Sequence, residues 1–147
     1  MKLTSKGRYG VRALFFIAYH HGGRPAQMRE VAEKAQIPAR FLEQIFHDLK
    51  RAGLVSAKRG PNGGYQLART ASQITLGDVV RALEGAPVVA ASRERDDPRD
   101  PIAVIFGDLE KNIEKCFDAV TVADVCARGE RLGLPKLGNV PAPEYAI

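Results

Sequence analysis

The sequence predicts a mainly α-helical protein with one small β-hairpin. Apolar residues recur at helical spacing through most of residues 5–52, and two short alternating runs then flank a glycine-rich loop at 59–64. In the second half, a long apolar stripe begins after residue 100, again at helical spacing. Helices therefore dominate the predicted fold, and the predicted sheet is confined to the hairpin.

Composition bounds the size and class of the protein. The 147 residues are enough for one domain, or for one small domain with an appendage, and a hydrophobic content of 45% supports a real core. No apolar run approaches the length of a membrane span, and the amino terminus lacks the basic-then-apolar layout of a signal peptide. We expect a soluble, cytoplasmic protein that does not enter a membrane.

The net charge of +5 hides an asymmetry along the chain. Residues 1–70 hold 13 Lys and Arg against 4 Asp and Glu, a net charge of +9, whereas residues 71–147 hold 9 against 13, a net charge of −4. An anionic partner such as nucleic acid would bind the basic half. A solvated basic face gives the same composition, so charge leaves both interpretations open.

The first predicted helix covers residues 5–21. The apolar residues that define it recur every three or four positions, at Val11, Leu14, Phe15 and Ala18. Gly22-Gly23 ends the pattern, because glycine readily adopts the conformation that follows a helix.

Two further helices meet at a short turn. The apolar residues of the earlier helix are Met28, Val31, Ala32 and Ala35, and those of the later one are Phe41, Leu42, Ile45, Phe46 and Leu49. Ile37-Pro38 breaks the pattern between them and leaves a turn of three or four residues. Pro38 suits the first position of the later helix, because its nitrogen carries no hydrogen that would need a partner there. Ala52-Gly53 ends that helix.

The stretch VSAKRGPNGGYQLAR at 55–69 predicts the hairpin. The alternating apolar residues are Val55 and Ala57 before the loop and Tyr65 and Leu67 after it. A nucleotide-binding loop would need Lys and then Ser or Thr after its last glycine, followed by a helix, whereas a strand follows here. A plain surface hairpin stays open as an alternative to a wing that presents Lys58 and Arg59. The order of helix, helix-turn-helix and hairpin favours the wing of a winged helix-turn-helix domain.

The later helix of the pair has a polar face. We expect Phe41, Ile45 and Leu49 to point inward, which leaves outside Arg40, Glu43, Gln44 and His47, with Lys50 and Arg51 at the far end. Arg, Gln and Glu side chains can pair with base edges in a DNA major groove, while Lys and Arg can hold phosphates. The alternative is an ordinary solvated helix face.

The second half contains a long predicted helix between two shorter ones. Capping boxes at Thr75–Asp78 and Thr121–Asp124 mark the starts of the short helices. The helix between them spans about 18 residues, roughly 27 Å, and carries an apolar stripe. The stripe consists of Ile102, Ile105, Phe106, Leu109, Ile113, Phe117 and Val120. We expect it to pack against a second copy of the chain, with the chain's own core as the alternative.

Four stretches of the sequence resemble the Rrf family of bacterial transcription regulators. They are LTSKGRYGVRAL at 3–14, IPARFLEQIFHDLKRAGLV at 37–55, RGPNGGYQLAR at 59–69 and ITLGDVVRALEG at 74–85. The resemblance implies a homodimer that binds a palindromic operator in double-stranded DNA. It also implies that Glu43 and Gln44 read bases and that Arg59 enters the minor groove. Arg40 replaces a small hydroxyl residue common among relatives, which bears on the operator sequence rather than on DNA binding.

We interpret the chain as three regions. Residues 1–85 would form the winged helix-turn-helix DNA-binding domain, residues 86–133 the dimerisation and sensor region, and residues 134–147, with three prolines in their sequence, an extended tail.

The cysteines argue against the cofactor of the best-known relatives. Cluster-binding members place three cysteines just before the long helix, and residues 85–101 contain none. Cys116 and Cys126 fit neither a disulfide framework nor a zinc spacing, and we expect both to be buried thiols. We therefore expect no metal site and no three-cysteine iron-sulfur cluster. A small molecule, a partner protein or thiol oxidation would then be the signal.

Two other classes of function are alternatives to a DNA-binding regulator. A protein-interaction adaptor on the same scaffold would be expected to lose the basic face, which this sequence keeps. An enzyme would need a catalytic set, and the sequence offers no Ser/His/Asp set, paired carboxylates or cofactor loop. We therefore expect a regulator and not an enzyme.

Overall fold

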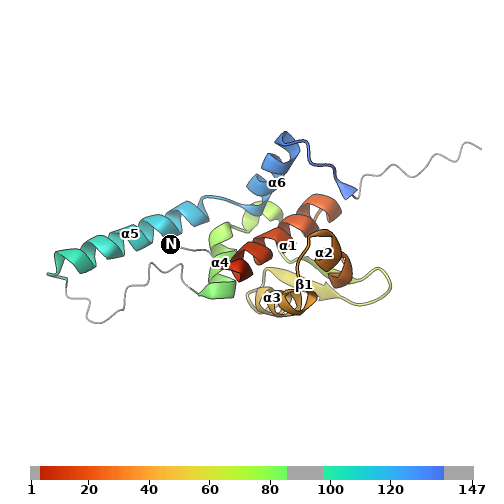
Figure 1. The fold of residues 1–147 in the computed structure, drawn as a ribbon, viewed down its shortest axis with the longest axis horizontal. Helices are drawn as coiled ribbons and strands as arrows, with labels where there is room; N and C mark the ends of the chain where they lie inside the picture. Colours follow the sequence, from red (N-terminus) through yellow and green to blue (C-terminus); the bar gives the residue numbers. More distant parts are fainter. Residues whose placement is uncertain (1–3, 86–97, 138–147) are drawn as a thin grey trace, which may run out of the picture.

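The computed structural model describes residues 4–85 and 98–137 (Figure 1). Its elements in chain order are α1 (Ser5–His21), α2 (Met28–Lys34), α3 (Ala39–Arg51), β1 (Val55–Lys58), β2 (Gly64–Leu67), the short 3₁₀ helix η1 (Ala71–Gln73), α4 (Leu76–Glu84), α5 (Pro101–Asp118) and α6 (Val122–Arg131). This mostly helical fold with a two-stranded antiparallel hairpin confirms the predicted class. Residues 86–97, and residues 138–147 of the predicted extended tail, lie outside the described part.

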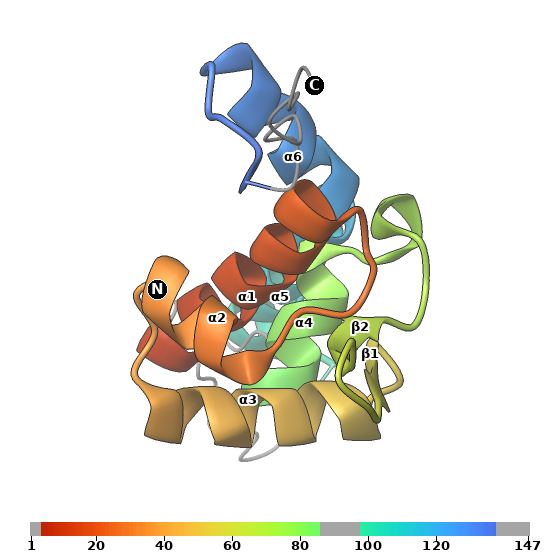
Figure 2. The same cartoon turned by 90° about the vertical axis from the view of Figure 1, so that its right-hand side faces the viewer.

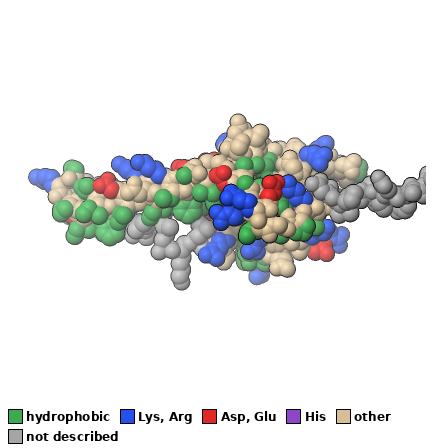
Figure 3. All heavy atoms as spheres, turned by 90° about the horizontal axis from the view of Figure 1, so that it is seen from above, with side chains coloured by type: hydrophobic (Ala, Val, Ile, Leu, Met, Phe, Trp, Pro, Cys, Tyr) green, Lys and Arg blue, Asp and Glu red, His purple; other side chains and the backbone are tan. Residues whose placement is uncertain are grey.

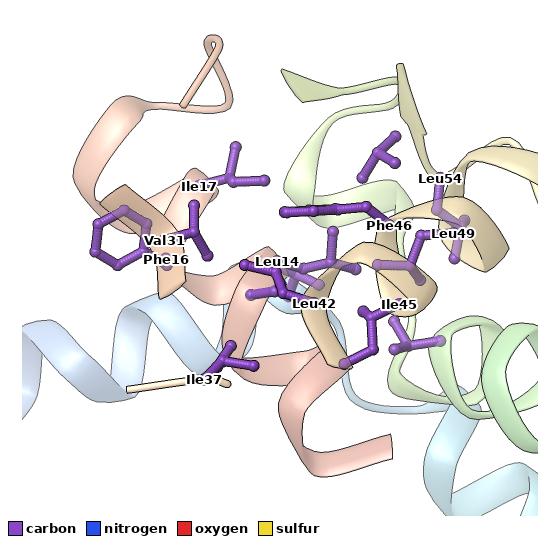
Figure 4. Packing of buried hydrophobic residues seen from close by; sticks show 14 of the residues in the cluster. Leu14, Phe16, Ile17, Val31, Ile37, Leu42, Ile45, Phe46, Leu49 and Leu54 are labelled. Atoms are coloured by element: carbon purple, nitrogen blue, oxygen red, sulfur yellow. The ribbon is translucent and has the colours of Figure 1, made fainter. Parts of the chain in front are cut away.

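The core is formed by α1, the helix-turn-helix of α2 and α3, and α4; Figure 4 shows part of this cluster from close by. Each helix turns one apolar face inward, as its spacing requires. The largest fully buried side chains include Leu14 and Ile17 from α1, Val31 from α2, and Leu42, Ile45, Phe46 and Leu49 from α3. This shared core fixes α3 against the body and leaves its opposite face outside.

The prediction that Phe41 points into the core is wrong. Its side chain is 46% exposed, whereas Leu42 and Phe46 are fully buried. Phe41 lies in the first turn of α3, and its ring lies 6.3 Å from that of Tyr9 on α1. Pro38 is the residue just before α3, one position earlier than predicted.

Backbone hydrogen bonds join the hairpin to the rest of the protein. Val55 pairs with Leu67 and Lys58 with Gly64 in an antiparallel register. Ala26, from the α1–α2 connection, exchanges two backbone hydrogen bonds of 2.8 Å with Tyr65 and so adds a third segment beside the hairpin. A Cβ at Gly64 would lie 2.2 Å from the Ala26 carbonyl oxygen, so only glycine allows this approach.

One aromatic stack joins the hairpin to α3. The rings of Phe46 and Tyr65 are nearly parallel, at 7°, with centroids 4.2 Å apart. Phe46 is fully buried, so the stack belongs to the core and holds the hairpin beside one end of α3 (Figure 2).

The second half is joined to the first where two helix starts meet. Thr75 and Thr121 form an isolated antiparallel bridge, and each accepts a hydrogen bond at the capping box that the sequence predicts. Leu76 N donates to the Val120 carbonyl over 2.8 Å, and Val122 N donates to that of Ile74 over 2.9 Å. These bonds set the direction in which α5 leaves the body.

Helix α5 carries its apolar stripe on the outside. It has 18 residues, none of them buried, and it extends away from the body (Figure 1). The alternative that the stripe fills the chain's own core is therefore wrong for the described residues. Val120 lies just beyond the end of the helix and is 37% exposed.

Substitution of the two phenylalanines tests the orientation of α3. Phe46→Ala should lower the free energy of unfolding by about 3–5 kcal/mol, because it leaves a cavity in the core and removes the stack. Phe41→Ala deletes the same atoms from a half-exposed position and should cost about 1 kcal/mol. Urea unfolding at a fixed protein concentration measures both. Equal losses would contradict the assigned inward face.

Candidate nucleic-acid interface

Helix α3 presents the predicted polar face to solvent. The side chains predicted to contact DNA are all exposed on it, namely Arg40, Glu43, Gln44, His47, Lys50 and Arg51. Helix α3 lies along one edge of the body, and α6 lies at the opposite edge (Figure 2). The outward face of α3 is therefore unobstructed by the described residues and can enter a groove of DNA.

The wing continues the basic surface. Lys58 and Arg59 are exposed at the end of β1 and in the loop that follows. The loop closes tightly, with Gly63 N donating to the Gly60 carbonyl over 2.9 Å, and a Cβ at Gly63 would lie 2.1 Å from the Lys58 carbonyl oxygen. Because the chain returns into β2 and not into a helix, a nucleotide-binding loop is excluded here.

A buried carboxylate on α3 was missed by sequence reasoning. Asp48 is 7% exposed, and its Oδ2 atom lies 2.7 Å from the Lys6 ammonium nitrogen of α1. Gln44 Nε2 donates to Asp48 Oδ1 over 3.1 Å, and the Arg51 guanidinium lies 3.9 Å from the same oxygen. Lys6 and Asp48 are 42 positions apart, so no local pattern signals this ion pair.

Asp48 orients the central predicted base reader. The Gln44 amide nitrogen carries two hydrogens and donates one of them in the hydrogen bond to Asp48. The other hydrogen and the amide oxygen are left for a base edge. The hydrogen bond from Lys6, with help from Gln44 and the charge of Arg51, lowers the pKa of the Asp48 carboxyl against the opposing effect of burial. The Asp48 carboxylate is therefore ionised at neutral pH, and it accepts the hydrogen bond that orients Gln44.

The two cysteines differ in their surroundings. Cys126 is half-buried, and burial raises the pKa of its thiol. Cys116 on α5 is exposed, so the prediction that it is a buried thiol is wrong. Among residues 4–85 and 98–137, no three His, Cys, Asp or Glu side chains come together as a metal site. No described helix is long and apolar enough to cross a membrane.

Residues 3–128 match the model of the Rrf2 family, which is described as an iron-dependent transcriptional regulator. The chain belongs to the Rrf2 family. The resemblance seen in the sequence motifs is thereby confirmed. An Rrf2 chain is a DNA-binding transcription regulator and not an enzyme.

Similar sequences and structures agree with this assignment. The protein rrf2 of Nitratidesulfovibrio vulgaris is 36% identical over 130 residues, which cover 85% of this chain and 87% of that protein. The regulator IscR of Vibrio atlanticus is 35% identical over 136 residues, which cover 90% of this chain and 79% of IscR. The structure of IscR from T. potens has a TM-score of 0.75 at 34% identity, covering 92% and 93% of the two chains. CymR, the global cysteine regulator of B. subtilis, has a TM-score of 0.70 at 31% identity, covering 87% and 98%.

The donor set of this Rrf2 chain does not fit a cluster held by three cysteines. The whole sequence has two cysteines, one exposed on α5 and one half-buried on α6. Clusters of the common kind take thiolates as most of their four protein ligands.

The ion pair of Asp48 should make stability depend on pH. Because the folded pKa of Asp48 lies below its ordinary value of 3.8, its contribution is fully present above that value and is lost as pH falls through the folded pKa. Asp48→Asn should therefore cost about 1–3 kcal/mol at neutral pH, and this deficit should shrink as pH falls below 3.8. Unfolding measured from pH 7 down to about pH 2 tests this, with Glu33→Gln, an exposed carboxylate on α2, as the control. A deficit that stays constant over this range would contradict it.

Proposed function

We propose that this regulator binds a palindromic operator as a homodimer, with α3 in the major groove and the wing against the neighbouring minor groove. One observation carries the proposal: the exposed polar face of α3 and the basic wing are held side by side by the Phe46–Tyr65 stack. An Arg-rich, water-facing surface on a helix and an adjoining loop suits both base edges and phosphates.

The residues of this surface divide into two roles. Gln44 and Glu43 lie in the middle of the outward face, where a helix in the groove comes closest to the bases. Lys50 and Arg51 lie in the last turn of α3, and Lys58 precedes the wing loop, so all three suit phosphates. Arg59 suits the minor groove, and His47 lies between the two groups on α3.

The apolar stripe of α5 supports a homodimer. Side-chain exposure reaches 64% at Ile102, 59% at Ile105 and 46% at Leu109, and Phe106 is 44% exposed. At 3.6 residues per turn the stripe residues fall within a sector of about 120°, which includes the half-buried Ile113 and Phe117. Hydrophobic side chains gather along the whole of α5 (Figure 3). A continuous apolar patch of this kind is typical of an interface between chains.

The dimer accounts for the palindrome. Two copies that share the stripe about a twofold axis would present two identical α3 helices and two wings. Identical readers related by a twofold axis select half-sites that are inverted repeats. Such a regulator would act in the cytoplasm, where bacterial DNA lies.

We also propose that the regulator carries no iron-sulfur cluster. Two cysteines on different helices, one with a pKa raised by burial, support this. The signal would then be a small molecule, a partner protein or oxidation of a thiol.

Base readers and phosphate contacts should respond differently to substitution. Gln44→Ala should relax base preference at one position of each half-site and leave the salt dependence of binding unchanged. Lys50→Ala should weaken binding to every duplex alike and reduce the slope of log Kd against log salt by about one per chain. Binding to a duplex selected from a random pool, and to its single-base variants, separates the two. The roles are wrong if both variants shift all duplexes equally.

The dimer interface can be tested by charge insertion. Ile105→Asp should produce monomers, because it places an unpaired carboxylate in the apolar contact at a cost of several kcal/mol. Sedimentation velocity at micromolar concentration measures the assembly state. Lys111→Asp, on the opposite side of α5, should leave the dimer intact. A wild type that sediments as a monomer would refute the proposed interface.

The cofactor proposal predicts a colourless protein. Anaerobic purification followed by iron and acid-labile sulfide analysis should find neither in stoichiometric amount, while the protein still binds its selected duplex. Stoichiometric iron and sulfide that disappear in Cys116→Ala or Cys126→Ala would overturn the proposal.

A further inference from the structure

Four side chains form a column on the flank of α3 that faces α1. The Arg12 guanidinium carbon lies 5.7 Å from the centroid of the Tyr9 ring, the Tyr9 and Phe41 centroids are 6.3 Å apart, and the Arg40 guanidinium carbon lies 5.1 Å from the Phe41 ring. Two neighbouring aromatic rings thus lie between two cations, from Arg40 at the edge of the polar face of α3 to Arg12 on α1. We call this set, Arg12, Tyr9, Phe41 and Arg40, the cation–aromatic column.

The column is open to solvent, and the positive charges of its two arginines are not neutralised by any carboxylate of the described residues. Arg12 and Arg40 are exposed, Phe41 is 46% exposed and Tyr9 is partly exposed. Within the described residues, no carboxylate lies within ion-pair distance of either arginine. Exposed arginines stacked on aromatic rings are held in one orientation and keep their outward N–H groups available for an anion.

The place of the column matches one edge of a DNA groove. The wing meets α3 at Phe46, whereas Phe41 and Asp48 meet α1 on the other flank. A major groove is about 12 Å wide and 8.5 Å deep, so the phosphates that border it stand alongside the flanks of an inserted helix. One bordering strand would therefore pass the wing and the other would pass the column.

We propose that the cation–aromatic column is a second phosphate-binding surface, which holds the DNA strand on the side of α3 opposite to the wing. This inference rests on the proposed function and adds contacts from α1 to it. Arg12 provides a phosphate contact from outside the helix-turn-helix, and Arg40 turns toward the same strand because its guanidinium lies over Phe41. The column then positions α3 in the groove and carries no base preference itself.

The test compares substitutions at Arg12 on two duplexes. The probes are a 30-base-pair duplex that the wild type selects from a random pool and an unrelated duplex of equal length, titrated across a salt series. Arg12→Ala should weaken binding to both by a similar factor, roughly tenfold for the dimer, and reduce the salt slope by about two. Arg12→Lys should keep the slope, because the charge remains. Arg128→Ala, the same change at an exposed position on α6, should alter neither quantity.

The outcomes separate this inference from the proposed function. If the wild type binds with steep salt dependence and Arg59→Ala weakens it, but Arg12→Ala leaves affinity and slope unchanged, the column is not a phosphate-binding surface. If the wild type shows no salt-dependent binding, the proposed function itself fails. A loss confined to the selected duplex would make the column a base reader and also overturn the inference. Should Arg12→Ala not fold, Arg12→Gln keeps the stem over Tyr9 and gives the same readout.

Discussion

The stacking of Phe46 on Tyr65 determines how the two parts of the candidate interface act together. Phe46 belongs to the buried face of α3, and Tyr65 belongs to the wing strand that also pairs with Ala26. A wing held on both sides cannot move independently of α3. The distance between the polar face of α3 and Arg59 is therefore set by the core, so DNA bound by both parts as proposed must fit both at once.

The same principle extends to the second half of the chain. Two sets of contacts fix α5 to the body. They are the backbone hydrogen bonds between the starts of α4 and α6 and the ion pair of Arg81 with Asp118, at 2.7 Å. If α5 is the dimer contact, its direction sets the separation of the two α3 helices. A signal that shifts α5 by a small angle would then change the spacing that the dimer fits, without touching either α3.

Much of this organisation could be predicted from the sequence, because local residue patterns determine where helices and the hairpin begin and end. Helix spacing, the glycine-rich loop and two capping boxes gave the element order, and the family motifs confirmed it. Contacts between distant residues could not be predicted in this way. The pair of Lys6 with Asp48, the exposure of Phe41 beside Tyr9 and the exposure of Cys116 all depend on how α1, α3 and α5 sit in space. For the same reason, the cation–aromatic column is visible only in the structure.

A hydroxyl-radical footprint on a selected duplex tests the central claim most directly, because it reports which strands and grooves the protein covers. Two rigid α3-and-wing units related by a twofold axis predict two symmetric protected half-sites. Their centres should lie about 34 Å apart or a multiple of that distance, each with protection extending into a flanking minor groove. A single asymmetric footprint, or two half-sites without minor-groove protection, would contradict the account.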